Sequence, residues 1–310
     1  MKNLKNEIIA FIKDYVKASN AKGVVVGMSG GKDSLVVAKL CTLAIGSEKV
    51  FGVIMPKGEM SDIDDAKESC ELLGIDYEIA DIKNIYDEIE SLTMSVLKTN
   101  NLSSVTKLNI SPRIRMNILY SVGGTLGYLV ANTSNLSERM VGYSTKWGDA
   151  VGDFAPIANL TKTEVCELGL ELGLPEHLVN KKPADGLTGS TDEEIMGFSY
   201  AELDAFIREG KTSKNHEKIE KMHRASAHKR NPITSFNSNR KNHFEDKWAE
   251  EKHLKKVFFL CKNYSGRTQT SIQDLKFESS SSSAIVSSIA LFELPQAGNT
   301  VSKRLSDSSR

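Results

Sequence analysis

The sequence lacks paired cysteine motifs, an excess of charge of one sign and long apolar stretches, and each absence argues against a class of protein. Its cysteines include no C-x-x-C pair, which argues against a zinc ribbon, a dithiol redox motif and a disulfide framework; they are Cys41, Cys70, Cys166 and Cys261. Charge of one sign is not in excess, since 40 Lys and Arg balance 40 Asp and Glu, and no stretch is apolar enough to span a bilayer. We therefore expect a cytoplasmic protein with reduced thiols and without nucleic-acid or membrane partners, in which any anionic ligand is bound by local groups.

What the chain does have is enough apolar surface for a substantial core. With 40% hydrophobic residues over 310 positions, it suits one large α/β domain or two small ones. Residues 1–19 alternate apolar and charged side chains, which predicts an amphipathic helix rather than a signal peptide. From about Asn237 the composition shifts towards Asn, Lys and Ser, as is typical of disorder. We expect one folded domain over 1–236 and an appended low-complexity tail over 237–310, with a second domain there as the alternative.

Short apolar runs alternate with helical patterns along the first half of the chain. The runs at 23–28 and 50–55 are almost free of polar residues, as expected for strands covered on both faces. Further strands are predicted at 77–81 and 127–132, and helices at 34–43, 61–73, 113–122 and 161–172. This alternation predicts an α/β fold with an open, doubly wound, Rossmann-like parallel sheet and helices on both faces. Ligands of such a sheet bind beyond the carboxyl ends of its strands.

A glycine-rich turn joins the first predicted strand to the next helix. It places small residues where the backbone must bend sharply and approach a ligand, and its sequence is Gly27-Met28-Ser29-Gly30-Gly31-Lys32-Asp33-Ser34. Its N–H groups and the positive end of the helix form a site suited to phosphate or pyrophosphate. Asp33 beside that anion favours ATP with a bridging cation such as Mg²⁺. A plain strand-to-helix connection is the alternative.

The turn differs from two common nucleotide motifs. A Walker A loop requires G-x-x-x-x-G-K-[ST], but Val26 occupies the first glycine position and Asp33 follows the lysine, and G-x-G-x-x-G is absent. S-G-G-x-D-S instead resembles the loop of the N-type ATP pyrophosphatases, which include NAD, GMP and asparagine synthetases and tRNA-modifying enzymes. The resemblance implies an adenine nucleotide α hydrolase-like fold and adenylation of an oxygen with cleavage of ATP between its α and β phosphates.

The segment 132–138 follows the fourth predicted strand, so its polar side chains should emerge at the ligand edge of the sheet. There Glu138 can face Asp33 and form a carboxylate pair for Mg²⁺, in which the metal neutralises charge on a leaving pyrophosphate. An acid at a helix terminus beside Arg139 is an equally weighted interpretation of Glu138.

The next segment, 142–153, is too rich in glycine and charge to be ordinary core. We interpret it as a binding loop in which Lys146 meets an anionic substrate group and Asp153 accepts a hydrogen bond from a ribose or amide. A solvated surface turn is the alternative, and the ordered motifs that follow it favour the binding loop.

Several motifs occur in the order seen in ammonia-dependent NAD synthetases. They are Arg113-Ile114-Arg115-Met116, the segment 132–138, Gly142-Tyr143-Ser144-Thr145-Lys146-Trp147-Gly148-Asp149, Pro156-Ile157 with Leu160-Thr161-Lys162-Thr163, Thr191-Asp192-Glu193-Glu194 and His228-Lys229-Arg230. The resemblance covers about residues 1–236. It implies a ligase that amidates deamido-NAD, the nicotinic acid dinucleotide, to NAD with ATP and ammonia in the last step of NAD biosynthesis.

The resemblance also implies a role for each matching residue. Those expected to bind ATP are Gly27, Met28, Ser29, Gly30, Gly31, Lys32, Asp33, Ser34, Thr133 and Lys162, with Asp33 and Lys162 acting in catalysis. Those expected to hold deamido-NAD are Arg113, Lys146, Asp153, His228 and Lys229, and Mg²⁺ would bind Asp33 and Glu138. The basic groups suit a pyrophosphate and a carboxylate, although His228-Lys229-Arg230 equally suits an ordinary basic helix end.

Two positions depart from the family pattern. Asn132 stands where the family commonly has glycine, and Ala184 where a threonine often follows the lysine-proline pair. Neither replacement removes a charge, so neither excludes activity. The ATP contact expected at position 184 loses its hydroxyl, and whether Ser190 or Thr191 substitutes is left open.

The implied reaction needs no protein nucleophile. A carboxylate oxygen of the nicotinate attacks the α-phosphorus of ATP, pyrophosphate leaves, and ammonia converts the acyl adenylate to the amide. Because only one helix and one strand precede the loop, we expect free ammonia as the nitrogen donor, with a separate glutaminase as its source. The resemblance further implies a homodimer with the dinucleotide site at or near the interface.

Two other functions compete with this one. A tRNA-modifying ATP pyrophosphatase should show a catalytic cysteine pair or a strongly basic face, and neither is evident. A nucleotide-binding module without chemistry would need only the loop from Gly27 to Ser34. It would leave the later acid, lysine and arginine motifs unexplained.

Overall fold

A computed structural model describes residues 2–58, 62–181 and 191–236 of the chain. The chain divides into two units, Met1–Pro232 and Ile233–Arg310. The fold described below is that of the first unit. Ala184, Ser190 and the predicted tail from 237 onwards lie outside the described residues.

Four parallel strands form the centre of the first unit. They are β1 Gly23–Gly27, β2 Val50–Ile54, β3 Asp76–Ile79 and β4 Tyr128–Val130, in the order β3-β2-β1-β4. The chain builds outwards from β1 in one direction and then returns to add β4 on its other side. Such a reversal is the topological switch point of a doubly wound sheet, and ligands bind there beyond the carboxyl ends of the strands. The predicted parallel sheet is confirmed.

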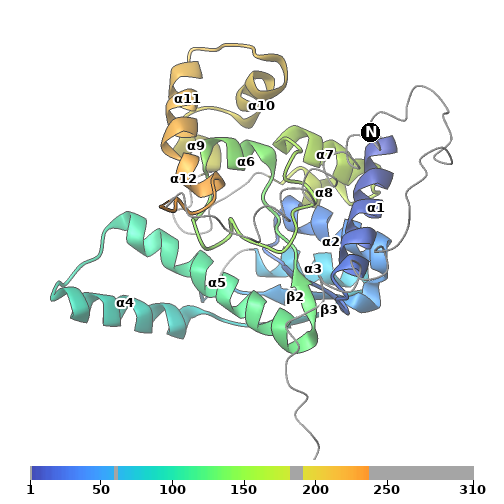
Figure 1. The fold of residues 1–310 in the computed structure, drawn as a ribbon, viewed down its shortest axis with the longest axis horizontal. Helices are drawn as coiled ribbons and strands as arrows, with labels where there is room; N and C mark the ends of the chain where they lie inside the picture. The colour runs from blue at the N-terminus through green and yellow to red at the C-terminus, as the bar shows by residue number, and fades with distance from the viewer. Residues whose placement is uncertain (1, 59–61, 182–190, 237–310) are drawn as a thin grey trace, which may run out of the picture. The chain divides into compact units, whose positions relative to one another are not determined.

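Helices pack around this sheet (Figure 1). They are α1 Lys2–Ala18, α2 Lys32–Ile45, α3 Ile63–Leu73, α4 Lys83–Leu97, α5 Ser104–Leu126, α6 Leu136–Val141, α7 Lys162–Glu171, α8 Glu176–Val179, α9 Asp192–Met196, α10 Tyr200–Glu209, α11 His216–Ala225 and α12 Ala227–Arg230, with a short 3-10 turn, η1, at Ser47–Lys49. Among these described helices, none combines the length and apolar composition needed to cross a bilayer.

One predicted helix is much longer in the structure than its sequence pattern indicates. The pattern begins after Pro112, but α5 begins at Ser104, where the Ser103 side chain accepts a hydrogen bond from the Thr106 N–H. The helix then continues through Pro112 and ends at Gly127, which has a left-handed conformation. The local cap at Ser103 and the packing of Ile110 into the core keep the helix going through a residue that lacks a backbone donor.

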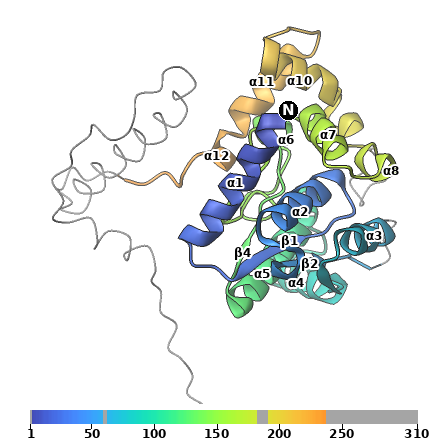
Figure 2. The same ribbon diagram turned by 90° about the vertical axis from the view of Figure 1, so that its right-hand side faces the viewer.

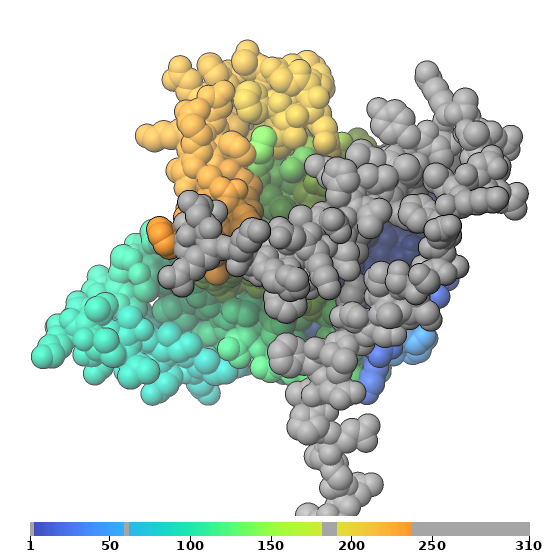
Figure 3. Space-filling view, viewed as in Figure 1, coloured from blue at the N-terminus to red at the C-terminus, as the bar shows by residue number. Residues whose placement is uncertain are grey.

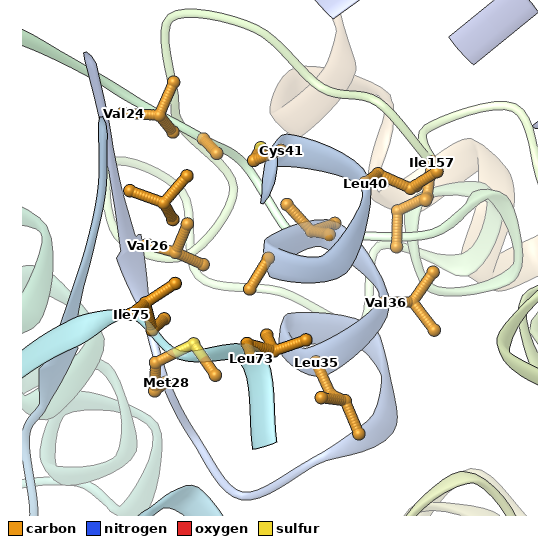
Figure 4. Packing of buried hydrophobic residues seen from close by; sticks show 14 of the residues in the cluster. Val24, Val26, Met28, Leu35, Val36, Leu40, Cys41, Leu73, Ile75 and Ile157 are labelled. Carbon is orange, nitrogen blue, oxygen red and sulfur yellow. The ribbon is translucent and has the colours of Figure 1, made fainter. Parts of the chain in front are cut away.

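The two faces of the sheet have separate cores, as the alternation of side chains along a strand requires. Val24 and Val26 of β1 point into a large core formed with α1, α2, α3, α7 and α8, while Val25 points into a smaller one formed with α4 and α5. Figure 2 shows the sheet between these layers, and Figure 4 shows α2 packed on β1 in the larger core. The predicted helices on both faces are therefore confirmed.

A third apolar cluster lies in the helices that follow β4. Val141 of α6, Met196 of α9, Leu203 of α10 and Ile219 of α11 pack together, and these helices gather on one side of the sheet in Figure 1. This small core gives α6 and α10 a rigid support close to the residues that face the ligand edge.

Candidate active site

The loop between β1 and α2 is braced by its own hydroxyl groups. Ser34 Oγ donates to the Gly31 carbonyl oxygen (2.9 Å) and accepts from the Ser29 N–H (3.3 Å), while Ser29 Oγ accepts from the Gly31 N–H (3.2 Å). Gly30 has φ +75°, and a Cβ there would lie 2.3 Å from the Asp62 carbonyl oxygen. The tight turn therefore requires glycine at position 30.

The N-terminus of α2 lines a cavity. Gly31 is the N-cap residue, and no described side chain caps this helix. Its first-turn N–H groups and the positive end of its dipole therefore suit an anion. The cavity has a volume of about 400 Å³, within the range of small-molecule sites. Its described lining comes from the loop, from the ends of β1, β2 and β4, from the segment 142–153, and from parts of α3, α5, α6, α7 and α9 with adjoining residues.

Three charged side chains meet at one side of this cavity. Lys162 Nζ lies 2.7 Å from Asp33 Oδ2 and 2.9 Å from Glu138 Oε1, and the lysine is only 6% exposed. Burial opposes its charge, but the carboxylates of Glu138 and Asp33 hold the pKa of Lys162 above its ordinary value. Burial raises the pKa of Glu138, against the effect of Lys162. Lys162 is therefore a permanent positive charge at the edge of the sheet.

Glu138 lies at a helix terminus, as one of the two sequence interpretations expected, and it also lies close to the Asp33 side of the cavity through Lys162. It is the third residue of α6 and forms a capping box with Asn135, whose Oδ1 accepts from the Glu138 N–H (3.0 Å). Its other function is the contact with Lys162. Asn135 also reaches the cluster, because its Nδ2 donates to Asp33 Oδ1 (3.2 Å). The N-x-x-E spacing is a signal for the capping box, but no sequence pattern indicates the contact between Asn135 and Asp33.

The two carboxylates have the chemistry of a Mg²⁺ site. Asp33 and Glu138 both offer hard oxygen ligands beside one ammonium group. Mg²⁺ commonly takes one or two carboxylates and completes its shell with phosphate oxygens and water. Within the described residues no group of three or more His, Cys, Asp and Glu side chains gathers to hold a metal. A cation here would therefore depend on oxygens from a bound phosphate ligand.

The remaining predicted ATP residues are placed differently. Thr133 and Met28 line the cavity. Lys32 also contributes to its lining, but its buried ammonium group lies 3.4 Å from Cys166 Sγ of α7. Lys32 is therefore directed at a neighbouring helix and does not take the position of a Walker lysine.

The five residues predicted to hold the dinucleotide lie outside the described lining of this cavity. Arg113 Nε donates to the Lys146 carbonyl oxygen (3.4 Å), so these two residues are neighbours. Asp153 Oδ2 accepts from the Val130 N–H of β4 (2.7 Å). Lys229 Nζ donates to the carbonyl oxygens of Gly142 (2.7 Å) and Ser144 (2.6 Å), while His228 is exposed. These contacts gather along the segment 142–153.

Comparison with known proteins decides the family. A family model described as NAD synthase matches residues 4–247. The chain belongs to this family. It is 44% identical over 202 residues to the NH(3)-dependent NAD(+) synthetase of Thermococcus sibiricus, covering 65% of this chain and 78% of that protein. The predicted resemblance is confirmed, and the tRNA-modifying alternative is not supported.

Solved structures of the same family agree with the fold. The NMN synthetase from Francisella tularensis has a TM-score of 0.71 at 33% identity, over 76% of this chain and 98% of that one. The NH3-dependent NAD synthetase from Campylobacter jejuni, in complex with nitrate, has a TM-score of 0.63 at 30% identity, over 76% and 99%. The predicted adenine nucleotide α hydrolase-like fold is confirmed.

The departure at Asn132 has a structural explanation. Its Nδ2 donates to the carbonyl oxygens of Asp149 (2.9 Å) and Val151 (3.0 Å), and its Oδ1 accepts from the Ser134 N–H (3.0 Å). At the position where the family resemblance predicted glycine, the Asn132 side chain therefore holds the segment 142–153 against the end of β4.

Proposed function

We propose that this chain is an ammonia-dependent NAD synthetase. It uses ATP to adenylate the nicotinate carboxylate of deamido-NAD, releases pyrophosphate, and lets ammonia displace AMP to form the amide of NAD. The observation that carries this proposal is the Lys162 ammonium group held between Asp33 and Glu138 in the cavity that the uncapped N-terminus of α2 also lines.

The geometry supports the first step through charge and position. The carboxylate oxygen forms a bond to the α-phosphorus while the bond to the pyrophosphate oxygen breaks, so negative charge grows on the leaving group. The N–H groups of α2 and the ammonium group of Lys162 offset that charge without having to reorganise. Because its carboxylate partners keep Lys162 protonated, it acts as a fixed charge and not as a base.

Formation of AMP and pyrophosphate is the direct test. We expect both products only when ATP, deamido-NAD and ammonium are present together, with one AMP for each NAD. The mononucleotide acid is the informative competitor, because one structural relative is an NMN synthetase. We expect kcat/KM to favour the dinucleotide by about tenfold or more, since uniform binding of the extra nucleotide lowers KM. A preference for the mononucleotide would contradict the substrate assignment, and no AMP with either acid would contradict the function.

We propose Mg²⁺ as the cation of this site, held by Asp33 and Glu138 together with phosphate oxygens. When bound, it would neutralise charge on the pyrophosphate. Mn²⁺ is a suitable probe because its electron spin resonance changes on binding. In the presence of ATP we expect Asp33→Asn to weaken Mn²⁺ binding, and the same Mn²⁺ affinity in both proteins would contradict the ligand set.

We propose that deamido-NAD is held by Arg113, Lys146, Asp153, His228 and Lys229. Lys229 already donates to two carbonyl oxygens of the segment 142–153, so it also shapes that segment. We expect Arg113→Ala and Lys146→Ala to raise KM for deamido-NAD more than KM for ATP. Equal changes in the two KM values would contradict a dinucleotide site at these residues.

We propose a homodimer formed through α4 and the beginning of α5. Leu92, Val96, Leu97 and Val105 are 61%, 73%, 63% and 67% exposed. Together they give this helix pair, teal in Figure 3, an apolar surface typical of protein interfaces. We expect light scattering to find a dimer that Leu92→Glu with Val96→Glu converts to a monomer. Leu43→Glu, at an exposed leucine of α2, is the matched control. A dimer that persists in the Leu92→Glu, Val96→Glu variant would exclude this surface.

We propose free ammonia, supplied in the cytoplasm by a separate glutaminase, as the nitrogen donor. Turnover with glutamine as efficient as with ammonium, measured on the purified protein, would contradict free ammonia as the donor.

We also propose that residues 1–236 suffice for catalysis. Because the family match runs to residue 247, chains ending at Phe236 and at Lys247 should be compared. A large loss of kcat only in the chain that ends at Phe236 would move the end of the catalytic domain beyond residue 236. A loss in both shortened chains would show that the rest of the chain is needed.

A further inference from the structure

A buried carboxylate on α10 joins the two helices that carry Glu138 and Lys162. Asp204 is 6% exposed. Its Oδ1 accepts a hydrogen bond from Ser137 Oγ (2.5 Å), and its Oδ2 accepts from the backbone N–H and the hydroxyl of Thr163 (2.8 and 2.7 Å). Ser137 immediately precedes Glu138, and Thr163 immediately follows Lys162. One side chain therefore contacts the neighbours of two residues of the ion cluster.

A further hydrogen bond closes this arrangement. The Lys162 N–H donates to Ser137 Oγ (2.9 Å), so the first turn of α7 is bonded directly to the first turn of α6. Ser137 has no exposed surface. A short chain of bonds thus runs from Asp204 through Ser137 to the backbone of Lys162.

Asp204 accepts one first-turn N–H of α7, that of Thr163, but neither helix depends on it for its capping box. The Thr161 side chain and Glu164 form a capping box at the start of α7, and Asn135 and Glu138 form another at the start of α6. Each helix thus supplies its own cap from its own sequence. What Asp204 adds is a connection between the two helix ends, made with an acceptor that gains strength from being ionised.

The same helix covers the Lys162 side chain. The ammonium group lies 5.1 Å from the centre of the Tyr200 ring, at the start of α10, and the Tyr200 hydroxyl donates to Asp192 Oδ2 (3.1 Å). Lys162 is therefore bounded by carboxylates on one side and by an aromatic ring from α10 on another. Helix α10 therefore contacts the cluster in two ways: Asp204 bonds to the backbone beside Lys162, and Tyr200 covers the Lys162 side chain.

We propose that Asp204 is a positioning residue for adenylation, acting through Lys162 and Glu138 and not by contact with substrate. This inference rests on the proposed function. By holding the first turns of α6 and α7 together, Asp204 keeps the Lys162 ammonium group between the two carboxylates. Displacement of a charge that stabilises the leaving group lowers kcat without weakening the binding of substrates to the same extent.

The test compares Asp204→Asn with Glu202→Gln. Glu202 is a matched control, because it lies on the same helix and accepts two hydrogen bonds from Asn215 Nδ2 (3.1 and 2.9 Å), away from α6 and α7. We expect Asp204→Asn to lower kcat for AMP formation about tenfold or more, with both KM values within about threefold. Glu202→Gln should keep kcat within about twofold, at a temperature well below the melting point of each protein. If Asp204→Asn does not fold, Ser137→Ala gives the same readout.

A double-mutant cycle separates positioning from a general loss of structure. If Asp204 acts through Lys162, the cost of Asp204→Asn should fall below about twofold in a Lys162→Ala background. If Asp204→Asn lowers kcat as much in the Lys162→Ala background as in the wild type, or if folded Asp204→Asn has wild-type kcat, the positioning role is overturned. Either result would leave the proposed function intact. A wild-type protein that forms no AMP with deamido-NAD would overturn the proposed function and the inference with it.

Discussion

The phosphate loop and the ion cluster line one cavity, yet they are built in different ways. The loop is a single run from Gly27 to Ser34, shaped by the φ of Gly30 and by hydroxyl groups within the run itself. The cluster brings together Asp33 and Lys162, which are 129 positions apart, with Glu138 from a third helix. The ATP site proposed at the loop therefore depends on local backbone geometry, whereas the position of the Lys162 ammonium group depends on how the helices pack over the sheet.

Removing the central charge should give the largest effect. We expect Lys162→Ala to lower kcat by about 10²- to 10³-fold, because the leaving pyrophosphate then lacks the fixed ammonium group that offsets its growing charge. Steady-state formation of AMP measures this. Lys5→Ala is the control, since Lys5 pairs with Glu171 of α7 (3.8 Å) outside the described lining of the cavity and should change kcat by less than about twofold. A kcat close to wild type for Lys162→Ala would remove the cluster from the mechanism.

Removing one carboxylate should have a smaller effect. We expect Asp33→Asn and Glu138→Gln to lower kcat by about 10- to 100-fold, because each variant loses one oxygen ligand for the cation. The KM for deamido-NAD should change much less than kcat. Asp14→Asn, at an exposed position of α1, provides the control. Near-normal formation of NAD by both variants would contradict the metal assignment.

The loop should respond to a change of backbone conformation. Alanine at Gly30 would carry a positive φ, and its Cβ would lie 2.3 Å from the Asp62 carbonyl oxygen. We expect Gly30→Ala to lower the free energy of unfolding by about 1–3 kcal/mol and to weaken ATP binding about tenfold. Thermal unfolding and calorimetric titration with ATP measure both. Gly124→Ala, in α5 with open space around it, should be neutral or slightly stabilising. Equal losses of stability and ATP affinity in the two variants would mean that the loop does not require glycine at position 30.

The lysine of the loop should matter less than that of the cluster. Because the Lys32 ammonium group lies against Cys166, we expect Lys32→Met to change KM for ATP by less than about threefold. In a Walker A loop, by contrast, the lysine reaches the phosphates directly. Initial rates over a range of ATP concentrations measure this. A rise in KM of tenfold or more would show that Lys32 contacts the phosphates when ATP is bound.

The smallest effect should come from a second link between α10 and α7, at the surface. Burial opposes ionisation of Glu164, but hydrogen bonds from Arg208 and Thr161 hold its pKa below the ordinary value of 4.5. A lowered pKa in the folded state adds stability at neutral pH that is lost as the pH falls through that pKa. We expect Glu164→Gln to lower the free energy of unfolding by about 0.5 kcal/mol at pH 7.

Urea unfolding from pH 7 to pH 3 measures the pH dependence of this link. The difference between wild type and Glu164→Gln should shrink through the acid range. Glu167→Gln, at an exposed position on the same helix, is the control. A difference that is constant with pH would show that the ionised form of Glu164 is not what stabilises the contact.

Some features of the site can be predicted from sequence because their causes are local. The strand, the glycine turn and the start of α2 all follow from residues 23–34, and the capping box at Asn135 follows from the spacing to Glu138. Element ends are less predictable. The fourth strand is only Tyr128–Val130, since Asn132 already turns its side chain to the segment 142–153.

Sequence alone was sufficient to predict the class of sheet and the glycine-rich loop, since periodicity, glycine conformation and capping depend on near neighbours. Only the tertiary structure decided that Asn135 and Lys162 share Asp33 and that Asp204 ties α6 to α7. It also directed Lys32 to Cys166 and Lys229 to the backbone of the segment 142–153. Each contact joins residues far apart in the chain, so it depends on how the helices pack at the carboxyl edge of the sheet.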